Sequence, residues 1–372
     1  MKLFLMFFCL LITNCAIAQT NMLLVDAKAT AETKALANNL RQLAKQHTLF
    51  GHQHATEYGH GWEGDDDRSD VKSVTGTHPA VIGVDLRGFT NCPPAEQDAV
   101  KQKLLKNIAA TYNRGGVVTV AWHFANPASG GGFYWVDSVS KPAVGLIIPG
   151  GAYHQQYKQI LKSVAGLIKD ARGKNGEQIP LIFRPYHEQD GNWFWWGKAH
   201  CTAAQFKSLW QFTVSFLRDS MQVHNLLYAF SPDCTFTNEA AFTERYPGND
   251  WVDMVGFDDY ADFGRDGHYN LAAGLQKLKI VHAFALQNNK LAAFTETGLE
   301  SVADNNWWTQ SLLATMLKEK LQICYVLVWR NDRNSPTHYY APFPGHPSVP
   351  DFLKFYQHNY TLFQNDLKNI YQ

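Results

Sequence analysis

Short apolar segments alternate with longer amphipathic segments along the chain after residue 20. Some of the short segments, such as GVVTVAW and YVLVW, are nearly continuous apolar runs, which is typical of strands whose two faces are both buried. Eight strands are predicted from these segments. Their expected ranges are Leu49 to Gln53, Ala80 to Leu86, Val117 to Phe124, Ile179 to His187, Leu226 to Ser231, Val252 to Phe257, Leu291 to Thr295 and Cys324 to Trp329.

The segments between the predicted strands show helical periodicity, with apolar residues recurring every three or four positions. Clear examples are residues 95–114, 156–172, 202–220 and 271–287. Eight successive strand and helix units predict an α/β fold, a (β/α)8 TIM barrel. A doubly wound open sheet is the structural alternative, but no glycine-rich phosphate loop follows the first strand. No other repeat and no low-complexity linker divides the chain, which favours a single domain.

The first twenty residues, MKLFLMFFCLLITNCAIAQT, predict a leader sequence. Lys2 precedes an apolar run that is too short to span a bilayer, and the run is followed by the small-residue pattern AIA. We therefore expect residues 1–18 to be a secretory signal peptide and residues 19–372 to be one mature domain. Lipid attachment at Cys15 is the alternative. Both readings predict an exported protein, periplasmic or extracellular.

The cysteines of the mature chain do not decide whether the protein contains disulfide bonds. Four cysteines remain after removal of the leader, and in an oxidising compartment they permit three disulfide pairings. Free, buried thiols are equally consistent with the sequence. The four residues are Cys92, Cys201, Cys234 and Cys324.

Charge and aromatic content narrow the class of partner. Lys plus Arg and Asp plus Glu number 33 each, so the chain has no broad basic field for nucleic acid or anionic lipid. Eleven tryptophans in a chain of this charge offer flat apolar faces suited to sugars, although most of these rings would serve equally well in a core. We expect a neutral carbohydrate partner and a monomer without a membrane span.

Polar residues at the carboxyl ends of barrel strands point into the active-site mouth, and two glutamates occupy such positions. Glu188 ends the fourth predicted strand and Glu296 ends the seventh, 108 positions later. That separation fits three βα units of about 36 residues each. The two strands lie on roughly opposite sides of the mouth, so the carboxylates can face each other across a bound bond. A retaining glycoside hydrolase needs such a pair, about 5 to 5.5 Å apart.

The surroundings of the two glutamates predict different roles. Glu188 lies in LIFRPYHEQDGNWFWWG, just before a run of aromatic residues, and a carboxyl packed against apolar rings keeps its proton. Glu188 is therefore the expected acid, whereas we expect Glu296 to be held ionised by Tyr260 and Arg330. One or two of the three tryptophans in this stretch should pack helices against the sheet. For either glutamate alone, a buried salt-bridge partner is the alternative.

The stretch RPYHEQDGNWFWWG, together with FTETG on strand seven and VWRND on strand eight, resembles family 26 of the glycoside hydrolases, chiefly β-mannanases. The similarity extends to LFGHQ on strand one and VVTVAWH on strand three, so it covers most of the mature chain in order. The resemblance implies a (β/α)8 barrel and a secreted β-1,4-mannanase that retains configuration by double displacement. It implies no cofactor and no metal.

The same resemblance implies roles for individual residues. Glu188 would be the acid/base and Glu296 the nucleophile. His187 would orient the acid, Tyr260 would hydrogen-bond the nucleophile, and Trp193 would flank the cleavage point. Contacts to sugars on the non-reducing side would come from His123, Trp329 and Arg330.

Two features leave the mode of action open. The chain reads Gln189-Asp190 where such proteins commonly have Met-Asn after the acid, which puts fine subsite preference in doubt. Gly-rich and aromatic-rich insertions at residues 57–70 and 126–139 should form walls at the mouth. Two modes of action are expected. The enzyme could cleave internal bonds of mannan, glucomannan or galactomannan, or it could release mannobiose from chain ends.

Three alternatives compete with this hypothesis. Xylan or mixed-linkage β-glucan could replace mannan as substrate. A sugar-binding barrel that has lost catalysis is a second alternative, although both glutamates argue against it. A metal-dependent barrel hydrolase is the third, because a His-x-His pattern at the end of strand one can begin a metal site. Its candidate ligands are His52, His54, Glu57, His60 and His187.

Overall fold

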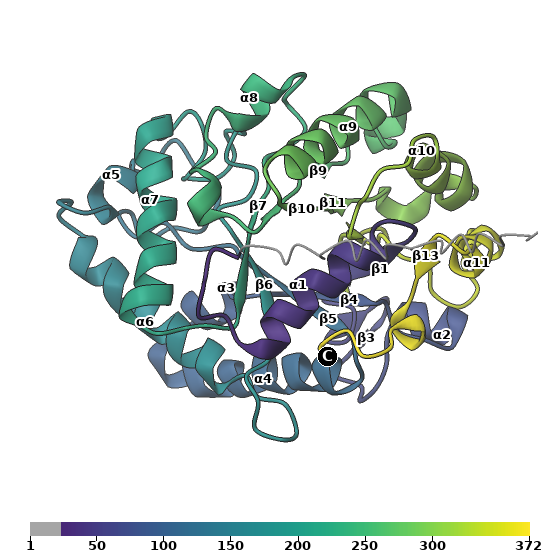
Figure 1. Ribbon diagram of the computed structural model, residues 1–372, viewed down its shortest axis with the longest axis horizontal. Coiled ribbons are helices and arrows are strands. Elements are labelled where there is room, and N and C mark those ends of the chain that lie inside the picture. The colour runs from purple at the N-terminus through teal and green to yellow at the C-terminus, as the bar shows by residue number, and fades with distance from the viewer. Residues whose placement is uncertain (1–23) are drawn as a thin grey trace, which may run out of the picture.

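The computed structural model describes residues 24–372, in which eight strand positions close into a barrel (Figure 1). Each strand pairs in parallel with its neighbours, and the last strand pairs with the first through Tyr325 and Leu49. The predicted (β/α)8 barrel is confirmed. Around the ring the strands are β1 (Thr48–Gln53), β4 (Val81–Asp85), β5 (Val117–Trp122), β6 (Leu181–Pro185), β7 (Leu226–Phe230), β8 (Met254–Val255) with β9 (Asp258–Asp259), β10 (Leu291–Ala292) with β11 (Phe294–Thr297), and β12 (Tyr325–Val328).

Strands six and seven are interrupted, which the apolar pattern did not predict. β8 pairs with β10, and β9 pairs with β11, so the two halves of each strand continue the ring on either side of a break. Gly256 lies at the break in strand six, and a Cβ there would come within 2.5 Å of the Thr295 side chain. The register of β11 against β12 also shifts between Phe294 and Thr297. Irregularities of this kind re-aim side chains next to active sites.

Helices surround the strands in Figure 1, as the periodicity predicts. The four expected segments contain α4 (Gln97–Asn113), α6 (His154–Asp170), α7 (Ala203–Ser215) and α9 (Leu271–Gln287). The N-terminus of α7 is fixed by a capping box between Thr202 and Gln205. The other helices are α1 (Ala31–Leu43), α2 (Asp70–Thr75), α3 (Arg87–Thr90), α5 (Val144–Ile147), α8 (Glu239–Thr243), α10 (Ala314–Leu317) and α11 (Val349–Gln357).

Shorter elements complete the described chain. The additional strands are β2 (Tyr58–Gly59), β3 (Trp62–Glu63) and β13 (Thr361–Leu362). The 3-10 and π turns are η1 (Pro94–Glu96), η2 (Phe216–Ser220), η3 (Asn249–Trp251), η4 (Arg265–Gly267), η5 (Glu300–Val302), η6 (Trp307–Leu313) and η7 (Gln364–Asp366).

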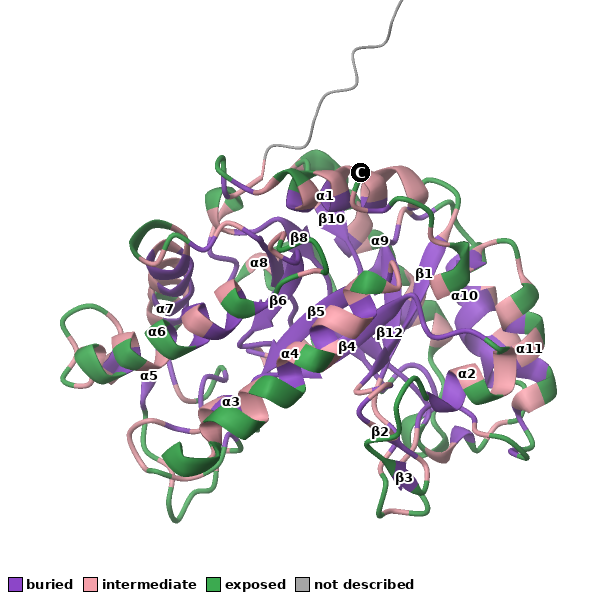
Figure 2. Ribbon diagram, turned by 90° about the horizontal axis from the view of Figure 1, so that it is seen from below, coloured by how far each residue is buried: buried purple, intermediate pink, exposed green. Residues whose placement is uncertain are grey.

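The core has two parts that together leave one end of the barrel open. The larger cluster of buried apolar side chains lies between the strands and the helices. Figure 2 shows the central strands as buried. A second cluster fills the barrel interior and includes Leu36 and Leu40 of α1 packed with Leu49, Ile182 and Leu227. Helix α1 therefore closes the amino-terminal end of the barrel. Access to the interior is left to the carboxyl ends of the strands, where such barrels place their active sites.

The N-terminal segment and the cysteines bear on export and on disulfide bonding. The predicted signal peptide and Cys15 lie outside the described residues. Within residues 24–372, no helix is both long and apolar enough to cross a bilayer. All four cysteines of that segment are free: Cys201 and Cys324 are buried, and Cys92 and Cys234 are partly exposed.

Candidate active site

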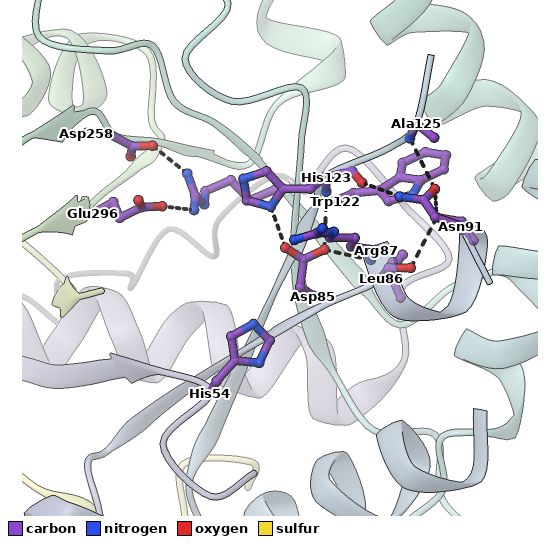
Figure 3. Close-up of polar contacts among 12 residues, drawn as sticks. His54, Asp85, Leu86, Arg87, Asn91, Trp122, His123, Ala125, Asp258 and Glu296 are labelled. Atoms are coloured by element: carbon purple, nitrogen blue, oxygen red, sulfur yellow. Dashed lines mark hydrogen bonds and ion pairs between the residues drawn. The ribbon is translucent and has the colours of Figure 1, made fainter. Parts of the chain in front are cut away.

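Glu296 is buried at the carboxyl end of β11, where the register shift turns the strand. The pairing of β9 with β11 places Glu296 opposite Asp258, and Figure 3 shows the two carboxylates side by side. Two residues after Asp258, the hydroxyl of Tyr260 donates a hydrogen bond of 2.6 Å to Oε1 of Glu296. The predicted contact between Tyr260 and Glu296 is confirmed.

A buried arginine holds the other oxygen of Glu296. Arg184, on β6, donates from Nη2 to Oε2 of Glu296 at 2.6 Å and from Nη1 to Oδ2 of Asp258 at 2.7 Å. The guanidinium is always charged, so it gives Glu296 a buried positive partner. The expectation that Arg330 does this is wrong, because Arg330 instead pairs with Asp332 at 2.6 Å. The sequence places Arg184 and Asp258 at strand ends that face the mouth, but it assigned neither residue a role in the site.

Glu188 follows β6 in a strained backbone conformation. Its φ is 53° and that of Tyr186 is 51°, a left-handed region that residues with a side chain rarely adopt. The backbone N–H of Glu188 donates to the carbonyl of Ser231 at 2.9 Å, which fixes the turn to strand five. Strain held in this way is characteristic of functional positions.

The carboxyl of Glu188 lies in apolar and acidic surroundings that favour its protonated form. Burial, and then the nearby charges of Asp258, Glu296 and Asp233, raises the pKa of Glu188 well above its usual range. The indole N–H of Trp193 donates to Oε2 of Glu188 at 2.6 Å and acts in the opposite direction. The direction of this pKa shift is the one expected beside an aromatic run, and the role of Glu188 as the acid stays a prediction.

Both glutamates line one cavity of about 320 Å³ at the mouth of the barrel. Trp193 contributes an exposed ring to its wall, with 37% of the side chain accessible. Trp195 and Trp196 are fully buried and donate their indole N–H groups to backbone carbonyls. One tryptophan of the motif therefore faces the cavity and two pack inside the protein, in agreement with the prediction.

Two histidines at the ends of strands three and four stand next to each other in this cavity. The rings of His123 and His187 meet edge to face with 4.6 Å between centroids. Burial, and then the charge of Arg184, lowers the pKa of His187 well below its ordinary value, so its ring is neutral. His187 follows β6 directly before Glu188, and its role in orienting the acid stays a prediction.

Asp85 at the end of β4 holds His123 in place, and it is a further strand-end residue to which the sequence assigned no role. Its carboxylate hydrogen-bonds Nδ1 of His123 and accepts the backbone N–H groups of Arg87 at 2.7 Å and His123 at 3.2 Å (Figure 3). Burial alone would raise the pKa of Asp85, but the His123 charge and these hydrogen bonds lower it below the usual range. The carboxylate therefore stays charged and fixes the ring.

A second cavity of about 630 Å³ adjoins the first on the side of strands one, two, three and eight. The two cavities share His123, Tyr134, Trp329 and His338. The predicted contact residues His123, Trp329 and Arg330 all line this second cavity. The opening therefore continues sideways from the two glutamates as a long cleft.

The residues that suggested a metal site do not converge in the described part of the chain. His54 pairs with Glu57 at 2.9 Å, and the ring of His60 stacks on Phe343 with 3.8 Å between centroids. One group of described residues, His187, Asp258 and Glu296, does have potential ligand atoms within 4.8 Å of one another. In that group the Arg184 guanidinium already supplies the positive charge between the two carboxylates.

Comparison with known proteins agrees with this geometry. A mannan endo-1,4-beta-mannosidase from Bifidobacterium adolescentis is 33% identical over 91% of this chain, which spans 35% of that relative's length. The solved structure of GH26C from a Muricauda species is 35% identical, with a TM-score of 0.88 over 94% of this chain and 96% of that one. A GH26 beta-mannanase from Bacteroides ovatus is 40% identical, with a TM-score of 0.86 over 92% and 98% of the two chains. The sequence profile of glycosyl hydrolase family 26 matches residues 25–336, and the chain belongs to that family.

Proposed function

We propose that this protein is a β-1,4-mannanase that hydrolyses mannosidic bonds with retention of configuration. The observation that carries the proposal is the unequal pair of carboxyls in one cavity: Glu296 is held by Arg184 and Tyr260, and Glu188 is held against Trp193 with a raised pKa. When the surroundings of two carboxyls push their pKa values apart, the carboxyl with the higher pKa acts as the acid and the other is free to act as the nucleophile. Several relatives, including the protein from Bacillus subtilis, are named mannan endo-1,4-beta-mannosidase.

In the first step, a carboxylate oxygen of Glu296 attacks the anomeric carbon of the bound sugar. The bond from that carbon to the glycosidic oxygen breaks, and Glu188 transfers its proton to the departing oxygen. The product is a glycosyl ester of Glu296. Arg184 and Tyr260 orient the attacking carboxylate by their hydrogen bonds.

In the second step, the ionised Glu188 accepts a proton from water as the water oxygen attacks the anomeric carbon. The ester bond breaks, Glu296 leaves as a carboxylate and Glu188 is protonated again. Two inversions give net retention. The exposed ring of Trp193 beside Glu188 is proposed to flank the cleaved bond, and His187 to orient the acid.

The adjoining 630 Å³ cavity is proposed to bind the non-reducing part of the chain through His123, Trp329 and Arg330. A panel of linear mannan, xylan and mixed-linkage β-glucan tests the sugar class. We expect reducing-sugar release chiefly from mannan. Faster hydrolysis of xylan or mixed-linkage glucan would contradict the proposed substrate, and no release from any of the three would contradict the proposed activity.

The pH dependence of activity should report the raised pKa of Glu188. A proton donor works only while it is protonated, so activity should persist above the pH at which an ordinary glutamate ionises and fall as pH rises through the raised pKa. Since the Trp193 hydrogen bond lowers that pKa, Trp193→Phe should move the alkaline limb of kcat/KM to higher pH. Profiles of kcat/KM against pH for both enzymes measure the shift.

A matched variant controls for loss of an indole N–H. The indole N–H of Trp135 donates to Asp137 at 2.6 Å and to neither glutamate, so Trp135→Phe should leave the alkaline limb in place. If Trp193→Phe leaves the limb unchanged or moves it to lower pH, Glu188 is not the group that controls it.

Chelation should have no effect on hydrolysis, because Arg184 supplies the positive charge that a metal would otherwise bring to Asp258 and Glu296. We expect kcat/KM on mannan to be unchanged after dialysis against EDTA. Loss of activity that is restored by a divalent cation would favour the metal-dependent alternative.

Export, domain organisation and oligomeric state complete the proposed picture of the protein. We propose that residues 1–18 direct export, with lipid attachment at Cys15 as the alternative, and that residues 19–372 form one catalytic domain. The exported protein would act as a monomer outside the cytoplasm. Product analysis over time on linear mannan separates cleavage of internal bonds from release of mannobiose.

A further inference from the structure

Exposed aromatic rings are concentrated at the mouth of the barrel. Among the described residues, Tyr134, Trp193 and Tyr269 are the aromatic side chains with more than about a third of their surface accessible, at 55%, 37% and 43%. Tyr134 and Trp193 line the cavity that contains the two glutamates. Tyr269 lies outside that cavity, and the mechanism gives it no role.

Tyr269 lines a third cavity, of about 580 Å³, which we call the side cavity. It is formed by the loops that follow β9, β11 and β12, and it shares Tyr260, Arg265 and Tyr340 with the cavity of the two glutamates. The side cavity therefore opens next to Glu296, on whose carboxylate Tyr260 makes its hydrogen bond.

Specific contacts hold the walls of the side cavity. Gly264 has a φ of 111°, and a Cβ there would come within 2.7 Å of the Tyr269 ring, so the loop needs glycine to seat that ring. The guanidinium of Arg265 lies over the Tyr260 ring, 4.7 Å from its centroid. Ser301, with a φ of 61°, donates its backbone N–H to the carbonyl of Tyr339 at 2.8 Å. Strained residues held by such contacts indicate a preformed site.

The chemistry of the side cavity suits a sugar. Tyr269 offers a ring face, and the carboxylates of Glu300 and Asp304 offer acceptors for hydroxyl groups. Asp304 acts on the Tyr269 hydroxyl, whose pKa is raised by burial and then by that carboxylate. An apolar ring with a few fixed polar groups is the usual construction of a small-molecule site.

The position of the side cavity decides which part of a substrate could enter it. The cleft for the non-reducing part lies on strands one, two, three and eight, and Glu188 with Trp193 marks the side of strand four. The side cavity lies on strands six, seven and eight; it meets the cavity of the two glutamates at Tyr260, Arg265 and Tyr340 and shares no lining residue with the cleft for the non-reducing part. We propose that it receives a single-sugar branch carried by the backbone unit bound over Glu296, an inference that rests on the proposed mannanase activity.

The test compares linear mannan with galactomannan, whose galactose branches extend from the mannan backbone. The unit bound over Glu296 becomes the reducing end of one product, so the wild-type enzyme should yield oligosaccharides with galactose on the reducing-end mannose. Tyr269→Ala removes the ring, and Ala303→Trp fills the cavity at an exposed residue with ordinary helical φ of −63°. Both variants should lower the yield of these products and kcat/KM on galactomannan at least about tenfold, with kcat/KM on linear mannan unchanged.

Two controls separate the ring from unspecific effects. Tyr269→Phe keeps the ring and should retain most of the reducing-end branched product. Leu317→Ala removes an equally exposed apolar side chain, 45% accessible, that does not line the side cavity, and it should behave as wild type on both substrates.

Different results would contradict the proposed mannanase activity and the proposed binding of a branch in the side cavity. Inactivity of the wild-type enzyme on linear mannan would contradict the function itself. If linear mannan is hydrolysed but no wild-type product carries galactose on its reducing end, the inference is wrong. Equal losses on both substrates in Tyr269→Ala would mean that the side cavity binds backbone units, and this result would also overturn it.

Discussion

Replacing Glu296 by alanine is expected to lower kcat on mannan by at least about 10⁴-fold, because no other group can form the covalent intermediate. The carboxylate accepts from Arg184 and Tyr260 at 2.6 Å each, so its position is set before substrate binds. Steady-state hydrolysis of linear mannan measures the loss. Turnover within about tenfold of wild type would remove Glu296 from the mechanism.

The fold should survive this substitution, which makes the kinetic result interpretable. Arg184 keeps its ion pair with Asp258 at 2.7 Å, so the buried guanidinium is not left without a partner. Glu319→Ala, which removes an exposed carboxylate paired with Lys279 at 3.1 Å, is a suitable control and should retain wild-type activity. Thermal unfolding of both variants checks that the loss of turnover is not a loss of structure.

Replacing Glu188 by glutamine should have a large effect that depends on the leaving group. The proton from Glu188 is needed most when the departing oxygen is a poor leaving group, as in a natural mannan chain. We expect a loss of about 10² to 10⁴-fold in kcat/KM on mannan, and a much smaller loss on a substrate with a dinitrophenyl leaving group. Kinetics on the two substrates measure this difference.

Glutamine is the better replacement because Glu188 adopts a φ of 53° and accepts the Trp193 hydrogen bond. The amide keeps an oxygen for that bond and a similar shape, but it cannot donate the proton of a carboxylic acid. Equal losses on the activated and natural substrates would contradict the acid role. A fall in thermal stability as large as that of an unrelated core variant would point to a structural role instead.

The barrel and its two glutamates could be predicted because both depend on local pattern. Buried parallel strands give near-continuous apolar runs, and residues at their carboxyl ends point into the mouth. The positions of Glu188 and Glu296 follow from strand order alone.

The partner of Glu296 could not be predicted in this way. Arg330 and Arg184 both end predicted strands, and only the register that sets Glu296 opposite Asp258 decides which guanidinium reaches the carboxylates. One indication was present, since an arginine within the apolar run LIFRP is buried only if carboxylates pair with it. The breaks in strands six and seven were equally hidden, because they involve close packing between Gly256 and Thr295 on these two neighbouring strands.

The stereochemistry of the first product tests the central claim most directly. Proton NMR of a linear manno-oligosaccharide during the first minutes of hydrolysis follows the anomer formed before mutarotation. If Glu296 forms an ester that Glu188 helps water to break, the β-anomer must appear first. Initial appearance of the α-anomer would mean that water attacks the sugar in a single displacement, and it would contradict the roles given to both glutamates.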